Sequence, residues 1–114
     1  METANQPAFP EWMKMLIEND GPQVERSVLV SVLNSITEKA NEGAWEEIGA
    51  VLKNAPVAEL SSTALTTLLR GTFLFQVKID AWNGFRDAVA SEFERRGLNV
   101  SRLMMGLLPV PKAS

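Results

Sequence analysis

Acidic side chains spaced four residues apart are the arrangement in this sequence that comes nearest to a metal site. Glu38, Glu42 and Glu46 follow this spacing, and on one continuous helix they would share a face. Gly43 interrupts the helical pattern between the last two, and no Glu-x-x-Glu or Glu-x-x-Asp pair stands on a second segment to complete a carboxylate site. The three glutamates are therefore expected to form a solvated surface, and no metal site is predicted.

Other chemistry is limited by residue types that the chain lacks. The sequence contains no Cys, no His and no Tyr, which removes the commonest general base, thiol nucleophiles and the nitrogen and sulfur ligands of zinc. Ser61 and Ser62 stand near Glu59 but have no adjacent base, so we expect them to cap a helix. The segments "GTF" and "NGF" lack the glycine and lysine spacing of a phosphate-binding loop. We therefore expect neither an enzyme nor a cofactor.

The composition is that of a soluble globular protein. Of the 114 residues, 46% are hydrophobic and 22% are charged, and a chain of this length can bury one core without disulfides. No apolar run approaches the roughly 18 to 20 residues of a membrane-spanning helix. The first twelve residues are polar and acidic, unlike a signal peptide. We expect a cytoplasmic protein without membrane contact.

Charge is distributed unevenly between the two halves of the chain. Residues 1–69 carry four cations against ten acids, and residues 70–114 carry seven cations against four acids, so balances of −6 and +3 make up the net charge of −3. Such polarity can steer a partner or align copies of the protein. It is also compatible with ordinary charged helix surfaces.

Helical periodicity dominates the chain and predicts an all-α fold. Six segments repeat apolar residues at helical spacing between proline, glycine or capping residues: 10–19, about 18 residues within 22–42, 44–55, 61–70, 81–96 and 101–108. Gly43, Gly71 and Gly97 are the expected stops, and Asp80 is the expected N-cap of the fifth helix. The prediction is a compact bundle of five to six short helices arranged as helical hairpins. The single domain spans 10–108, between flexible segments at 1–9 and 109–114.

Three tryptophans suggest an internal repeat. Trp12, Trp45 and Trp82 each stand near the start of a predicted helix, 33 and 37 residues apart, which is typical of helical-hairpin repeats. The segment "WEEIGAVL" resembles the first helix of a tetratricopeptide repeat over eight residues. The chain then departs from that family, with bulky Leu68 and Phe73 where it tends to place a small residue and a proline. The spacing fits both a closed bundle and a solenoid-like stack with an open concave surface.

The stretch "TFLFQVKIDAW", residues 72–82, departs from the helical pattern. Phe73, Phe75, Val77 and Ile79 alternate with polar residues, which is the period of a half-buried strand. A lone strand has no edge to pair with, so we predict an apolar connector between two helices that ends at Asp80, with its conformation, helical or extended, left open. In an extended connector Phe73 and Phe75 would face one side, whereas in a continuing helix they would point in roughly opposite directions. Their surface is expected either to pack on the bundle or to be covered by a partner or a second copy.

Protein binding is the function that these features favour. Arginine and aromatic residues are the usual anchors of protein interfaces. The predicted partner-binding residues are Arg70, Phe73, Phe75, Lys78, Arg86, Arg95 and Arg96. The domain is expected to act as an adaptor, regulator or inhibitor of a larger protein or complex, or to form a homodimer.

The alternative function is a nucleic-acid-associated regulator. The basic second half supplies Arg86, Arg95, Arg96 and Arg102 as candidate phosphate contacts. A helix-turn-helix would place Asn83 and Arg86 early in its recognition helix, but that motif uses a turn of three or four residues. The segment before Asp80 is longer and strongly apolar, and the whole chain is acidic, so this remains the second choice.

Overall fold

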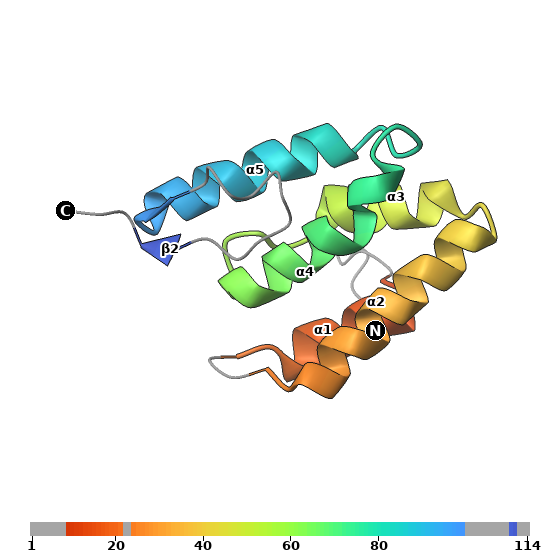
Figure 1. Cartoon of the computed structure of the whole chain (residues 1–114), viewed down its shortest axis with the longest axis horizontal. Helices are drawn as coiled ribbons and strands as arrows, with labels where there is room; N and C mark the ends of the chain where they lie inside the picture. The colour runs from red at the N-terminus through yellow and green to blue at the C-terminus, as the bar shows by residue number, and fades with distance from the viewer. Residues whose placement is uncertain (1–8, 22–23, 100–109, 112–114) are drawn as a thin grey trace, which may run out of the picture.

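The computed structural model describes residues 9–21, 24–99 and 110–111 and confirms an all-α fold (Figure 1). Its elements, in chain order, are α1 (Glu11–Asn19), α2 (Arg26–Asn41), α3 (Trp45–Asn54), α4 (Ser62–Thr72), the 3₁₀ turn η1 (Phe73–Phe75), α5 (Trp82–Arg95), β1 (Leu98–Asn99) and β2 (Val110–Pro111). The two-residue strands β1 and β2 pair antiparallel, a pairing that the sequence did not indicate.

Helix α4 occupies the centre of the molecule. It contacts α2 on one side and α5 on the other, while α1 packs on α2 and α3 packs on both α2 and α5. Figure 1 shows α4 between α5 and the α1–α2 pair. Seven of its eleven residues are buried, including Thr66, Thr67 and Thr72. A helix surrounded in this way buries most of its circumference and not a single stripe.

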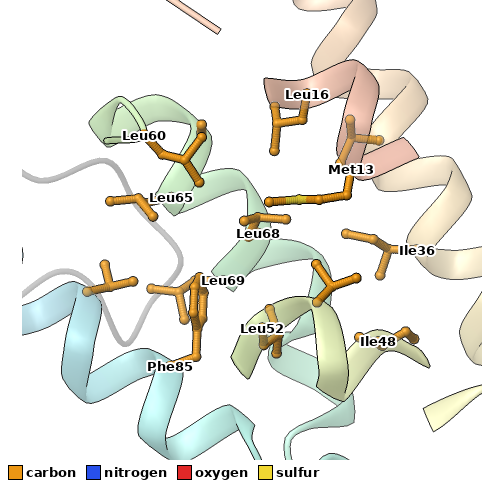
Figure 2. Close-up of a cluster of buried hydrophobic side chains, with 14 of the residues drawn as sticks. Met13, Leu16, Ile36, Ile48, Leu52, Leu60, Leu65, Leu68, Leu69 and Phe85 are labelled. Carbon is orange, nitrogen blue, oxygen red and sulfur yellow. The ribbon is translucent and has the colours of Figure 1, made fainter. Parts of the chain in front are cut away.

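All five helices contribute to one hydrophobic core. Figure 2 shows side chains from each of them meeting around α4, among them Met13 from α1, Ile36 from α2, Leu52 from α3, Leu68 from α4 and Phe85 from α5. The five helices therefore form one compact bundle around α4.

The predicted helix stop at Gly71 is wrong, because helical structure continues through this residue. Of the two conformations left open for the connector, its first part adopts the helical one. Helix α4 runs to Thr72, η1 covers Phe73–Phe75, and a turn follows. Gly71 serves close packing and not helix termination: a Cβ there would lie 3.0 Å from both Leu33 Cδ2 and Ile36 Cδ1. Glycine thus lets α4 approach α2, and the chain goes on turning because Gly71 does not adopt the left-handed conformation of a helix stop.

The predicted cap at Asp80 is also wrong. Helix α5 begins at Trp82 with Ala81 in the N-cap position and no side-chain cap, and Asp80 is exposed one residue earlier. The position is set by Ile79, which is 2% exposed and whose carbonyl accepts a hydrogen bond from the Trp82 backbone N–H at 2.9 Å. The turn that leads into α5 therefore begins at the buried Ile79. Asp80 lies within this turn with its side chain exposed, and it does not cap the helix.

The predicted stops at Gly43 and Gly97 and the predicted cap at Ser61 fit the structure. Gly43 and Gly97 follow their helices with φ of +77° and +78°, the left-handed conformation that glycine tolerates. Ser61 caps α4 through a 3.0 Å hydrogen bond from Ala64 N. Helix α2 starts at Arg26, later than predicted. Phe9, the one described residue of the predicted 1–9 segment, packs on the core, and the predicted helix 101–108 lies outside the described residues.

Candidate functional site

The segment between α4 and α5, residues 73–81, is fixed at both ends by buried contacts. Trp82 Nε1 donates a 2.9 Å hydrogen bond to Thr72 Oγ1 across the base of this connector, and both side chains are buried. Phe73 packs edge-on against Trp82, with ring centroids 6.1 Å apart. Phe75 packs on Trp45 of α3 at 5.5 Å. The connector is therefore held against α3 and α5 by aromatic side chains that point inward.

Two apolar side chains of the connector point into solvent. Leu74 is 81% exposed and Val77 is 84% exposed. The one further exposed large apolar residue in the described ranges is Val30, at 43%. The 3₁₀ geometry explains Leu74, because successive residues of such a turn point about 120° apart. With Phe73 and Phe75 directed at Trp82 and Trp45, Leu74 is left facing outward.

A groove runs beside the connector along the outer face of α3 and α5. Its larger hollow, about 610 Å³, is bordered by Leu52, Val57 and Phe85 and by the small residues Ala55, Ala81, Gly84 and Ala88. A second hollow of about 300 Å³ continues towards Trp45 and includes Gly49 and Ala50. Both hollows share Lys53, Asp80 and Ala81. Small side chains on two packed helices thus leave a shallow, partly apolar depression.

The groove carries charges of both signs. Glu46, Lys53, Lys78 and Asp80 line it, and all four are exposed. Each lacks an ion-pair partner within the part of the chain that the structure describes. Their charges sum to zero, so the surface favours neither a purely acidic nor a purely basic ligand.

Five of the seven predicted partner-binding residues lie at this end of the molecule. Phe73 and Phe75 are half-buried anchors, and the exposed apolar surface is formed by Leu74 and Val77 instead. Arg70 and Lys78 are exposed. Arg86 lies over the Trp82 ring, 5.7 Å from its centroid, and pairs with Asp87 at 2.9 Å. Leu74 and Val77 are three positions apart, so they share a face if the segment is helical. This spacing was the sequence signal for the exposed pair, and the alternation of apolar and polar residues drew attention to Phe73 and Phe75 instead.

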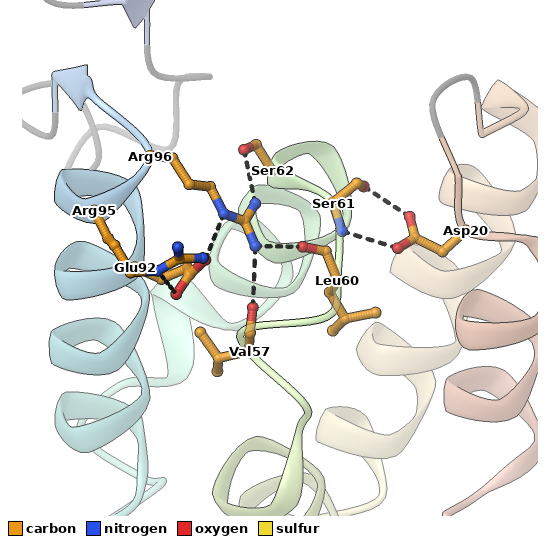
Figure 3. Close-up of polar contacts among 8 residues, drawn as sticks. All are labelled: Asp20, Val57, Leu60, Ser61, Ser62, Glu92, Arg95 and Arg96. Atoms are coloured by element: carbon orange, nitrogen blue, oxygen red, sulfur yellow. Dashed lines mark hydrogen bonds and ion pairs between the residues drawn. The ribbon is translucent and has the colours of Figure 1, made fainter.

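The other two predicted residues, Arg95 and Arg96, lie at the opposite end of α5, where they form internal contacts (Figure 3). Arg95 lies nine positions after Arg86 on the helix, a rise of about 14 Å along the helix axis. Arg96 Nε donates to Glu92 Oε2 at 2.7 Å, and its Nη atoms donate to Ser62 Oγ at 3.0 Å and to Leu60 O at 2.8 Å. Arg96 thus ties α5 to the segment before α4. It is not part of the connector surface, by which we mean the exposed side chains of Leu74, Val77, Lys78 and Asp80.

Glu92 is the electrostatic centre of this contact. Arg95 and Arg96 both hydrogen-bond its carboxylate, and these bonds, Arg95 first, lower the pKa of Glu92 from 4.5 to about 2. On the other side of the same loop, Asp20 accepts hydrogen bonds from Ser61 N at 2.8 Å and from Ser61 Oγ at 2.7 Å. The start of α4 is therefore held from both sides, which is a structural role.

Neither a metal site nor a membrane-spanning helix occurs among the described residues. No group of three or more Asp, Glu, His or Cys side chains there is placed to hold a metal ion. In the same ranges, no helix combines the length and the apolar composition that crossing a membrane requires. The exposed Leu74 and Val77 beside the groove make the connector the strongest candidate site in this part of the chain.

Comparison with known proteins finds no match: no family model, no curated protein and no solved structure is significantly similar to this chain. Its function must therefore be inferred from the connector surface itself.

Proposed function

We propose that this protein is a non-catalytic, cytoplasmic protein-binding domain, an adaptor, regulator or inhibitor that contacts its partner through the α4–α5 connector. The observation that carries the proposal is the exposure of Leu74 and Val77, at 81% and 84%, on a segment whose neighbouring aromatic residues are fixed inward. Apolar side chains displayed on a fixed segment lose little conformational freedom when they bind, which favours affinity.

The size of the hydrophobic contribution supports this role. Burying one Leu or Val side chain contributes about 1.5–3 kcal/mol, so the pair can anchor a moderate interface. The adjacent groove offers further apolar surface at the half-buried Val57, over a floor of the buried side chains Leu52 and Phe85. Anchor residues surrounded by a polar rim are the usual arrangement of protein interfaces, and Lys78 and Asp80 supply such a rim.

The nucleic-acid alternative lacks a comparable feature. Arg86 pairs with Asp87, and Arg95 and Arg96 both pair with Glu92, so carboxylates of the same helix accompany three of the four candidate cations. Arg102, the fourth, lies outside the described residues. Phosphate binding relies on cations gathered on one face, and these three are divided between the two ends of α5.

The test is affinity capture from native lysate with the tagged full chain and the double variant L74D/V77D. Both side chains are solvent-exposed, so we expect unchanged helicity by circular dichroism and the loss of captured protein. V30D is the matched control, because Val30 is an exposed apolar residue on α2, and it should bind like the wild type. Equal capture by L74D/V77D and V30D would refute the proposed surface.

A further inference from the structure

The connector surface is complementary to itself. An apolar pair, Leu74 and Val77, stands beside a cation and an anion, Lys78 and Asp80, on the same short segment. All four side chains are exposed. Neither Lys78 nor Asp80 has an ion-pair partner among the residues that the structure places. The surface therefore presents both halves of an ion pair next to an apolar centre.

A two-fold dimer requires this kind of self-complementarity. In an interface between identical chains related by a two-fold axis, residue i of one copy meets residue j of the other, and the reverse contact forms automatically. Lys78 and Asp80, two positions apart beside the apolar pair, meet that condition when the axis passes between them, because each cation then faces the other copy's anion. A patch of one charge sign would repel its own copy.

We propose that the surface formed by Leu74, Val77, Lys78 and Asp80 binds a second copy of this chain about a two-fold axis. Leu74 and Val77 of the two copies pack together at the axis, and Lys78 of each copy faces Asp80 of the other. The inference rests on the proposed function, since it names the partner of the same surface.

The charge balance favours a second copy over a partner of one dominant charge. Glu46 and Lys53 add one charge of each sign to the rim of the groove, so a strongly acidic or basic partner would meet repulsion at two of the four charges. The uneven charge of the two halves would instead favour head-to-tail contact, but such contact generates rings or open chains and not a closed pair. The connector surface carries equal numbers of positive and negative charges, which favours contact between identical surfaces and therefore a closed dimer.

The expected dimer is modest in strength. A standard interface buries about 800 Å² per partner, or roughly a ninth of the 7004 Å² surface of this chain. The exposed apolar centre of the connector consists of two side chains, Leu74 and Val77, whereas permanent dimers bury a larger and more hydrophobic area. We therefore expect a dissociation constant in the micromolar range.

Charge exchange between Lys78 and Asp80 tests the geometry. In K78E the new carboxylate meets Asp80 of the second copy, and in D80K the new ammonium meets Lys78. Both positions are exposed, so the monomers should fold normally, which circular dichroism checks. Each single variant should weaken dimerisation roughly tenfold or more at low ionic strength.

Mixing the two variants gives the decisive result. An equimolar mixture of K78E and D80K places opposite charges on both sides of the axis, so sedimentation equilibrium should show heterodimers of near wild-type affinity. The double variant K78E/D80K should likewise dimerise with itself. Dimerisation of both single variants at wild-type strength, or a mixture that remains as weak as its components, would overturn the proposed pairing.

The two proposals fail in different ways. A wild-type chain that stays monomeric at about 1 mM, far above the expected dissociation constant, overturns the dimer. Capture of another protein that depends on Leu74 and Val77 would then still support the binding function. Loss of dimerisation in L74D/V77D together with recovery in the charge-exchanged mixture supports both.

Discussion

Trp82 Nε1 donates a 2.9 Å hydrogen bond to Thr72 Oγ1, joining the last residue of α4 to the first residue of α5. Both side chains are almost fully buried, with 0% exposure at Thr72 and 1% at Trp82. Thr72 Oγ1 in turn donates to Leu68 O at 2.8 Å. The bond holds the two ends of the connector together, so the exposed positions of Leu74 and Val77 depend on it.

Replacing Thr72 by Val should destabilise the fold by about 1–3 kcal/mol. Valine keeps the shape of threonine but removes the acceptor, which leaves the buried Trp82 N–H without its partner. Urea denaturation measures the free energy of unfolding. T37V is the matched control, because Thr37 makes the same kind of bond to a backbone carbonyl on an exposed helix face. Equal losses in both variants would show that the Thr72–Trp82 bond contributes little.

The acid sensitivity of the fold should depend on Glu92. Its pKa is lowered from 4.5 to about 2 by Arg95 and Arg96, so the ionised carboxylate stabilises the folded state. This contribution is fully present above about pH 4.5 and is lost as the pH falls towards 2. The stability difference between the wild type and E92Q should therefore shrink over that range. A difference that stays constant from pH 7 to pH 2 would contradict the assignment.

Asp20 and Ser61 should act as one unit at the start of α4. S61A removes the cap of Ala64 N and one donor to Asp20, and should cost about 1–2 kcal/mol. D20A removes the acceptor of both Ser61 bonds. Because the two changes share one hydrogen bond, the double variant should lose less than the sum of the single losses. Urea denaturation of all four proteins measures this coupling, and strict additivity would argue against it.

The helical bundle was predictable because its signals are local. Apolar periodicity, Ser61 at an N-cap and glycines at Gly43 and Gly97 each act through neighbouring residues, and each prediction agrees with the structure. Gly71 failed as a stop because its role depends on Leu33 and Ile36 of another helix. Close approach between helices is a tertiary contact, and it leaves no mark in the local sequence that distinguishes it from termination.

The sequence singled out the connector as a candidate site, but it did not show which of the connector's side chains are exposed. The connector was singled out because Phe73 and Phe75 alternate with polar residues, yet the partners that bury them, Trp82 and Trp45, come from helices placed by the fold. Because these two rings face inward, the side chains of Leu74 and Val77 are the apolar ones that face the solvent. The internal contacts of Arg96 were hidden for a similar reason, because its acceptors Leu60 O and Val57 O belong to a loop far away in the sequence.

Site-specific photo-cross-linking tests the binding surface most directly. A photoreactive amino acid in place of Val77, introduced into the full chain, is expected to give a cross-linked adduct to a second copy or to another protein. The same amino acid in place of Val30 is the control, because that position is exposed on α2 away from the connector. An adduct at position 77 that is absent at position 30 is the predicted result. Equal labelling at both positions, or no adduct at position 77, would contradict the assignment of the connector as the binding surface.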